Sequence, residues 1–126
     1  MQNPTDKNIV ELRQEIGREF LKLFELRKSL YNVQKLLDYI CPKVELLGGE
    51  ISSIRLQLKV GQSMNSQIQP LFNLKNEKFK QLSEICETFV AHSNEKKRII
   101  GEIDFQESNI RGLVSELDNL EILENY

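Results

Sequence analysis

The segment Leu30–Leu58, LYNVQKLLDYICPKVELLGGEISSIRLQL, decides the fold. Its apolar residues recur alternately three and four positions apart, which is the spacing of the buried seam of a coiled coil. The seam residues are Leu30, Val33, Leu37, Ile40, Val44, Leu47, Ile51, Ile54 and Leu58. The spacing continues across Pro42 and the pair Gly48-Gly49, although these residues disfavour a helix interior. The pattern predicts one helix, bent near Pro42 and Gly48-Gly49, that packs along its length against other helices.

Composition supports a long helical protein and limits its partners. The 126 residues include no Trp and only 3 Pro, and their formal net charge is -2. Such a charge gives no general attraction to nucleic acid or to anionic membrane. No apolar run approaches the roughly 18 residues of a membrane span, and no signal peptide is visible. We therefore expect a cytoplasmic protein with reduced cysteines and with neither nucleic acid nor membrane as a partner.

Outward from this segment, the sequence predicts a first helix over residues 6–60. Thr5 or Asp6 is suited to cap it, because either side chain can accept hydrogen bonds from the first free amides. The first apolar stripe of this helix consists of Ile9, Leu12, Ile16, Phe20 and Leu23.

A cluster of turn-forming residues over 61–66 predicts the loop that ends this helix, with Ser66 as the next N-cap. A second helix is expected over 67–104, with its seam at Phe72, Phe79, Leu82 and Phe89. Helical spacing resumes over 109–124. Two options stay open here: a third short helix, or one that continues the second.

Because the loop lies near the middle, the chain is expected to form two arms, each ~80 Å long if fully helical. The predicted fold is all-α: a single rod-like domain built as a long antiparallel helical hairpin of coiled-coil or spectrin-like type. In this hairpin residue i lies near residue 127 minus i, so Cys41 comes level with Cys86. The pair is interpreted either as a redox switch or as two small residues that fill one packing layer.

No residue pattern indicates catalysis, a cofactor site or a metal site. His92 is the only histidine, and neither Cys41 nor Cys86 has a partner at metal-ligand spacing. We expect His92 to be a solvated helix residue. The sequence therefore predicts a protein that is not an enzyme.

Charge is unevenly distributed along the two arms. Residues 102–126 contain seven acidic side chains against Arg111 alone, so this end of the hairpin should repel acidic partners. The hairpin register places the cations Arg27 and Lys28 level with Lys96, Lys97 and Arg98. These five residues are interpreted either as a basic band that contacts an acidic partner or as a solvated helix face.

One stretch resembles a known family. It begins with Ile68-Gln69-Pro70-Leu71 and continues with Leu74, Lys75, Lys78, Phe79, Leu82, Ile85 and Cys86. It resembles the rod of the microtubule crosslinkers that include the plant sixty-five-kilodalton microtubule-associated proteins, over residues 10–105. The resemblance implies an antiparallel dimeric crosslinker that bundles microtubules, with a spectrin-like filament-binding module that has no counterpart here.

Two function classes follow. The first is a structural or interaction protein that self-associates through helix packing, with microtubules or a microtubule-bound relative as further partners and a cytoskeletal location. The alternative is a helical subunit of a hetero-oligomeric assembly such as a tether, kinetochore or trafficking complex. Both classes rest on the same seam, since two thin arms cannot bury all their apolar residues alone.

Overall fold

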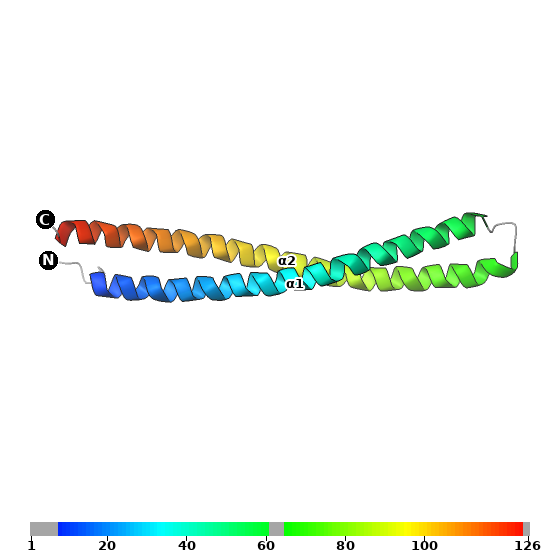
Figure 1. The fold of residues 1–126 in the computed structure, drawn as a ribbon, viewed down its shortest axis with the longest axis horizontal. Helices are drawn as coiled ribbons and strands as arrows, with labels where there is room; N and C mark the ends of the chain where they lie inside the picture. The colour runs from blue at the N-terminus through cyan, green and yellow to red at the C-terminus, as the bar shows by residue number, and fades with distance from the viewer. Residues whose placement is uncertain (1–7, 61–64, 125–126) are drawn as a thin grey trace. The chain divides into compact units, whose positions relative to one another are not determined.

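The computed structural model describes residues 8–60 and 65–124, and these residues form two α-helices and no strand. The first helix, α1, spans Ile9–Val60, and the second, α2, spans Asn65–Glu124. The two helices run antiparallel and pack as a hairpin (Figure 1). The predicted all-α helical hairpin is confirmed.

The helix ends differ slightly from the prediction. Asn8 caps α1: its Oδ1 accepts a hydrogen bond of 2.8 Å from the backbone N–H of Glu11, one of the amides left free at a helix start. The predicted caps Thr5 and Asp6 lie outside the described residues. α2 begins at Asn65, one residue before Ser66, the predicted N-cap. The rest of the predicted loop, 61–64, lies outside the described residues.

The first helix is continuous across Pro42 and Gly48-Gly49, as predicted, and the second is continuous where two options were left open. α1 is helical across Pro42 and Gly48-Gly49, where Ile40 and Leu47 on either side are buried. Burial of these neighbours offsets the backbone hydrogen bond that Pro42 cannot donate. α2 is likewise unbroken over 104–109, so residues 109–124 are the C-terminal part of α2 and not a third helix.

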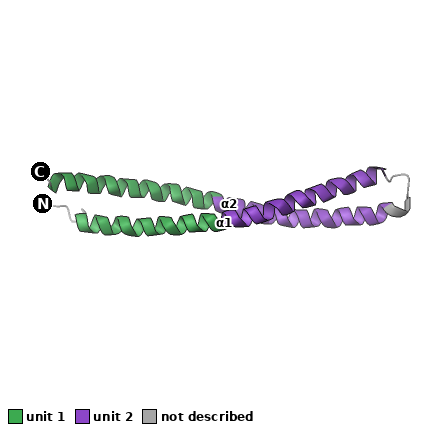
Figure 2. Ribbon diagram, viewed as in Figure 1, with its two compact units in different colours: residues 1–32, 97–126 green, residues 33–96 purple. Residues whose placement is uncertain are grey.

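The chain divides into two compact units (Figure 2). Unit 1 contains the described residues up to 32 and from 97 onward, and unit 2 contains the described residues within 33–96. In each unit a segment of α1 packs against a segment of α2. The two units have different cores and are described separately.

Unit 1 has a core to which both helices contribute. The buried apolar residues are Leu12 and Leu23 on α1 and Ile99, Ile103 and Ile110 on α2. The prediction of Phe20 as a seam residue is wrong, because this side chain is 52% exposed. Glu19 occupies the seam position and is half-buried. The regular alternation of three and four therefore holds through this region, with a polar residue in the seam.

The core of unit 2 comes mainly from α1. Its buried residues are Val33, Leu37, Ile40, Leu47, Ile51 and Ile54, while Val44 and Leu58 are half-buried. Leu30, the first residue of the predicted seam, is half-buried and belongs to unit 1.

The α2 side of unit 2 has half-buried residues at the same spacing, and four of them are polar. These residues are Ile68, Leu71, Lys75, Lys78, Leu82, Ile85, Phe89, His92 and Lys96. The prediction of Phe72 and Phe79 as seam residues is wrong, since they are 45% and 50% exposed. Each lies one position past the seam of α2, where Leu71 and Lys78 are the half-buried residues.

Two polar contacts between the helices lie within two positions of the predicted register, whereas the ion pairs Arg13–Glu121 and Arg27–Glu107 lie seven positions from it. In unit 2, Lys78 Nζ lies 3.0 Å from Glu50 Oε2, and the two form an ion pair that is not aligned as a hydrogen bond. Lys78 is one position from the residue predicted opposite Glu50. In unit 1, Gln106 contacts Glu19, which lies two positions from the residue predicted opposite Gln106.

The two cysteines differ in exposure: Cys41 is exposed and Cys86 is half-buried, and both are free thiols. Cys41 therefore does not fill a buried packing layer, because its side chain faces solvent.

Candidate functional site

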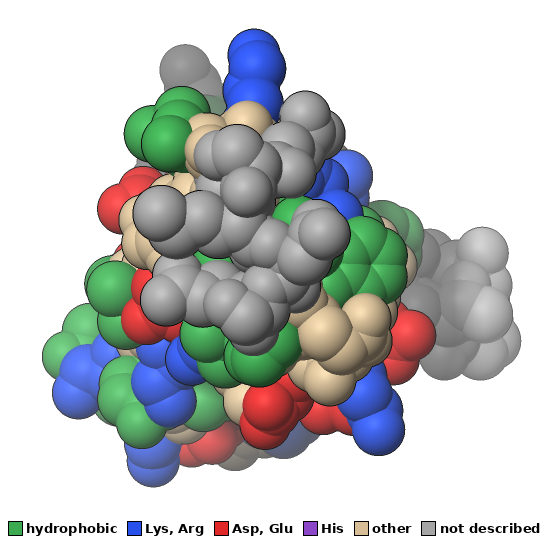
Figure 3. Space-filling model, turned by 90° about the vertical axis from the view of Figure 1, so that its right-hand side faces the viewer, with side chains coloured by type: hydrophobic (Ala, Val, Ile, Leu, Met, Phe, Trp, Pro, Cys, Tyr) green, Lys and Arg blue, Asp and Glu red, His purple; other side chains and the backbone are tan. Residues whose placement is uncertain are grey.

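Large apolar side chains remain on the surface of both helices. Ten on α1 and nine on α2 are exposed within the described residues. Figure 3 views the hairpin from the end at which α1 and α2 are joined, and hydrophobic side chains reach the surface there among Lys, Arg, Asp and Glu. A pair of helices has a single seam, and it does not cover the large apolar residues elsewhere on either helix. Some of these contact cations of their own helix: Lys43 lies over the Tyr39 ring and Lys75 over the Phe72 ring. Exposed apolar side chains are typical of a protein interface where several of them gather in one place.

A groove lies between α1 and α2 in unit 1, and we call it the unit 1 groove. Its volume is about 790 Å³. α1 lines it with Leu21, Lys22, Glu25, Leu26 and Ser29. α2 lines it with Arg98, Gly101, Glu102, Phe105 and Gln106. Leu21 and Phe105 are 68% and 74% exposed, so large apolar side chains stand at both walls of the groove.

A polar contact joins the two helices at the floor of the groove. Gln106 is 8% exposed, and its Nε2 donates a hydrogen bond of 3.1 Å to the backbone carbonyl oxygen of Glu19 and a second to the Glu19 carboxylate. Lys22 Nζ lies 3.1 Å from the same carboxylate. The hydrogen bond from Gln106, followed by that from Lys22, lowers the pKa of Glu19 below its usual range. Glu19 is therefore ionised at neutral pH although it occupies a seam position.

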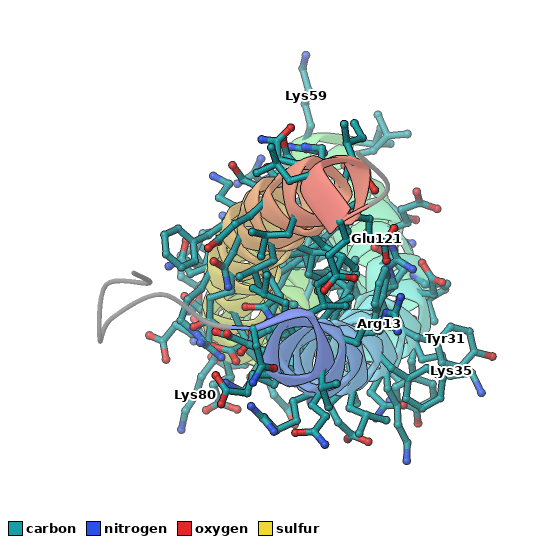
Figure 4. The ribbon with its side chains drawn as sticks, turned by 90° about the vertical axis from the view of Figure 1, so that its left-hand side faces the viewer. Arg13, Tyr31, Lys35, Lys59, Lys80 and Glu121 are labelled. Carbon is teal, nitrogen blue, oxygen red and sulfur yellow. The ribbon has the colours of Figure 1, made fainter. Side chains whose placement is uncertain are left out.

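Two ion pairs connect α1 to α2 elsewhere in unit 1. Arg13 lies 2.9 Å from Glu121, and Arg27 lies 3.1 Å from Glu107. Figure 4 shows Arg13 and Glu121 facing each other from the two helices. These contacts between exposed side chains contribute little stability each, on the order of 0–1 kcal/mol, but both favour the antiparallel register.

The predicted basic band is only partly available to an acidic partner. Arg27 is bound to Glu107, and Arg98 forms an ion pair with Glu102 one turn further along α2. Lys28 and Lys97 are exposed, whereas Lys96 is half-buried and belongs to unit 2. Because each of these two arginines already pairs with a glutamate of the same chain, it is less available to an acidic partner.

The described part of the chain shows no group of three or more His, Cys, Asp and Glu residues arranged to hold a metal ion. His92 is half-buried in unit 2, which corrects the expectation of a solvated residue. It lies at seam spacing between Phe89 and Lys96, so its ring faces the packed side of α2.

Of the two helices that the structure describes, neither is long and apolar enough to cross a membrane.

Protein-family models, curated proteins and solved structures were compared with the chain, and none of them matches it. The resemblance to microtubule crosslinkers therefore stays a prediction.

Sequence reasoning did not find the unit 1 groove or the contact between Glu19 and Gln106. The signal for Gln106 was present: a strict alternation of three and four continued from Ile68 places this residue on the seam of α2. Phe105 is its neighbour and therefore falls beside the seam. The groove itself depends on which side chains of α1 and α2 come together, and no pattern within either helix specifies that.

Proposed function

We propose that this chain is a non-enzymatic coiled-coil interaction protein that assembles by packing its exposed helix faces against other helices, including those of a second copy. The observation that supports this proposal most directly is the set of exposed large apolar residues, together with the unit 1 groove. Burial of apolar surface at roughly 25 cal/mol per Å² is the main driving force of protein association.

The proposal is tested by light scattering coupled to size-exclusion chromatography over a range of concentrations. The expected result is a mass that rises above the 14.7 kDa of one chain, or a stoichiometric complex with helical proteins recovered by affinity purification. A chain that stays at this mass at every concentration and recovers no stoichiometric partner would refute the proposal.

The second candidate is a subunit of a hetero-oligomeric helical assembly. Unit 2 favours it, because this unit has its own exposed residues, among them Tyr39, Leu46 and Phe79, which lie outside the unit 1 groove. A complex in which different helical chains are recovered in fixed ratio, with unit 2 protected from hydrogen exchange, would favour this candidate over self-association.

The narrower proposal, kinship with microtubule crosslinkers, is supported by the exposed cations Lys28 and Lys97 and by the sequence stretch that begins at Ile68. It is tested by co-sedimentation with microtubules, alone and together with a full-length crosslinker of that family. We expect pelleting that decreases as salt increases, since the contact would be electrostatic. No pelleting in either mixture would refute this kinship and leave the broader interaction function in place.

A further inference from the structure

The unit 1 groove has free space and apolar walls. Leu21 on α1 and Phe105 on α2 expose most of their side chains, at 68% and 74%. Between them Gly101 leaves the surface open, because a Cβ atom built on this residue meets nothing within 4 Å. Gly101 therefore adds no side chain to the surface between the two walls, which leaves room there for a side chain of a partner helix.

The charged residues of the groove alternate in sign along each helix. On α1 the cation Lys22 precedes the anion Glu25, and on α2 the cation Arg98 precedes the anion Glu102. Since α1 and α2 run in opposite directions, Lys22 lies toward the same end of the groove as Glu102. For the same reason Glu25 lies toward the same end as Arg98. Each end of the groove thus has a cation on one wall and an anion on the other.

We propose that the unit 1 groove binds the same groove of a second copy of this chain. The two copies are related by a two-fold axis that runs along the helices, so that α1 of one copy lies on α2 of the other. This inference deepens the proposed function and rests on it, because it names the partner and the contact surface.

The two-fold axis pairs each charge with its opposite. Lys22 of one copy faces Glu102 of the other, and Glu25 faces Arg98, so that the interface contains two copies of each contact. Within one chain Lys22 pairs with Glu19 and Arg98 with Glu102, so in the dimer each cation would lie between a carboxylate of its own chain and one of the second copy. The same rotation places Leu21 of each copy against Phe105 of the other, which buries the most exposed side chains of both walls. The result is a four-helix arrangement in which neighbouring helices are antiparallel, a common geometry for helix bundles and for symmetric dimers.

Charge order distinguishes a second copy from other partners. A partner with charges of one sign would be repelled at half of the charged positions of the groove. A second copy is complementary at all four positions without any change of sequence. The mixed sign of the groove therefore favours self-recognition over binding to a uniformly acidic surface.

The decisive experiment uses two charge-reversed chains, Glu25→Arg and Arg98→Glu, measured by sedimentation velocity separately and as an equimolar mixture. In either homodimer two contacts become like-charged, and we expect dimerisation to weaken about 100-fold if each contact contributes about tenfold. In the mixed dimer the two substituted side chains would face each other as a cation and an anion, and the unchanged Glu25 would face the unchanged Arg98. Mixing should therefore restore dimerisation to within a few-fold of the original chain.

A steric pair of variants provides the control. Gly101→Gln fills the groove with a side chain of neutral charge and should reduce dimerisation at least tenfold. Gly49→Gln adds the same side chain to the part of α1 that lies in unit 2, where a Cβ also meets nothing within 4 Å, and should leave dimerisation unchanged. Circular dichroism verifies that both variants remain helical.

Three results would overturn the inference. One is an original chain that remains monomeric. Another is a pair of reversal variants that dimerise as the original chain does. The third is a mixture that stays dissociated, which would instead fit an arrangement with α1 against α1. The original chain still associates in the second and third cases, so the proposed function survives them, whereas a monomer without helical partners would refute both.

Discussion

Neighbouring leucines in unit 2 provide the sharpest test of the packing. Leu47 is 8% exposed and Leu46 is 63% exposed, although both lie on α1 and one residue apart. Replacement of leucine by alanine removes three carbon atoms, each worth about 0.8 kcal/mol when buried. With the cavity that remains, Leu47→Ala should lower the free energy of unfolding by about 3 kcal/mol. Leu46→Ala should lower it by less than about 1 kcal/mol, since water replaces the lost atoms and alanine favours helix.

Urea unfolding followed by circular dichroism at low protein concentration measures both changes. If the free energy of unfolding falls by about 1.5 kcal/mol per molar urea, the urea concentration at half-unfolding should decrease by about 2 M for Leu47→Ala. It should decrease by less than about 0.7 M for Leu46→Ala. Equal shifts would refute the assignment of Leu47 to the seam, and with it the continuity of the seam between Pro42 and Gly48.

Two further predictions concern unusual residues within the helices. Gly49→Ala should raise the free energy of unfolding by about 1 kcal/mol, because Gly49 is helical and a Cβ there meets nothing within 4 Å. Thermal unfolding measures this change, and a lower melting temperature would contradict the prediction. The pKa of Glu19 is lowered in the folded state, so its contribution to stability is complete above its ordinary pKa of 4.5 and is lost as the pH falls through the lower folded value. Gln106→Leu removes the largest cause of this shift and should raise the pKa of Glu19 in an NMR titration, and an unchanged titration curve would contradict the contact.

Much of the fold could be predicted from the sequence, because coiled-coil spacing is a strong signal. The alternation from Leu30 to Leu58 specifies the buried face of α1, and the turn-forming residues after Val60 specify antiparallel packing. The prediction failed where a large residue and the regular spacing disagreed. Phe72 and Phe79 were expected in the seam, yet a strict alternation of three and four places Leu71 and Lys78 there.

The candidate site was much harder to predict. Its members Leu21, Gly101 and Phe105 belong to no motif, and each is an ordinary surface residue when its own helix is considered alone. They form a groove only because residues far apart in the sequence come together in unit 1. The pairing of Arg27 and Arg98 with glutamates was missed for a related reason, since the pattern of charges gives the sign of a surface but not which side chains bind each other.

The order in which the chain folds follows from the division into units. Contacts in unit 2 can form around the short connection between α1 and α2, whereas unit 1 joins segments such as those of Arg13 and Glu121, 108 residues apart in sequence. Closing a long loop costs more entropy than closing a short one, so pairing should begin in unit 2 and proceed toward the termini. Yet in unit 2 lysines occupy part of the α2 seam, and the side chains that are almost fully buried, Leu12 and Ile99, lie in unit 1. A nascent chain therefore gains its best-packed core only after residues beyond 96 have been synthesised.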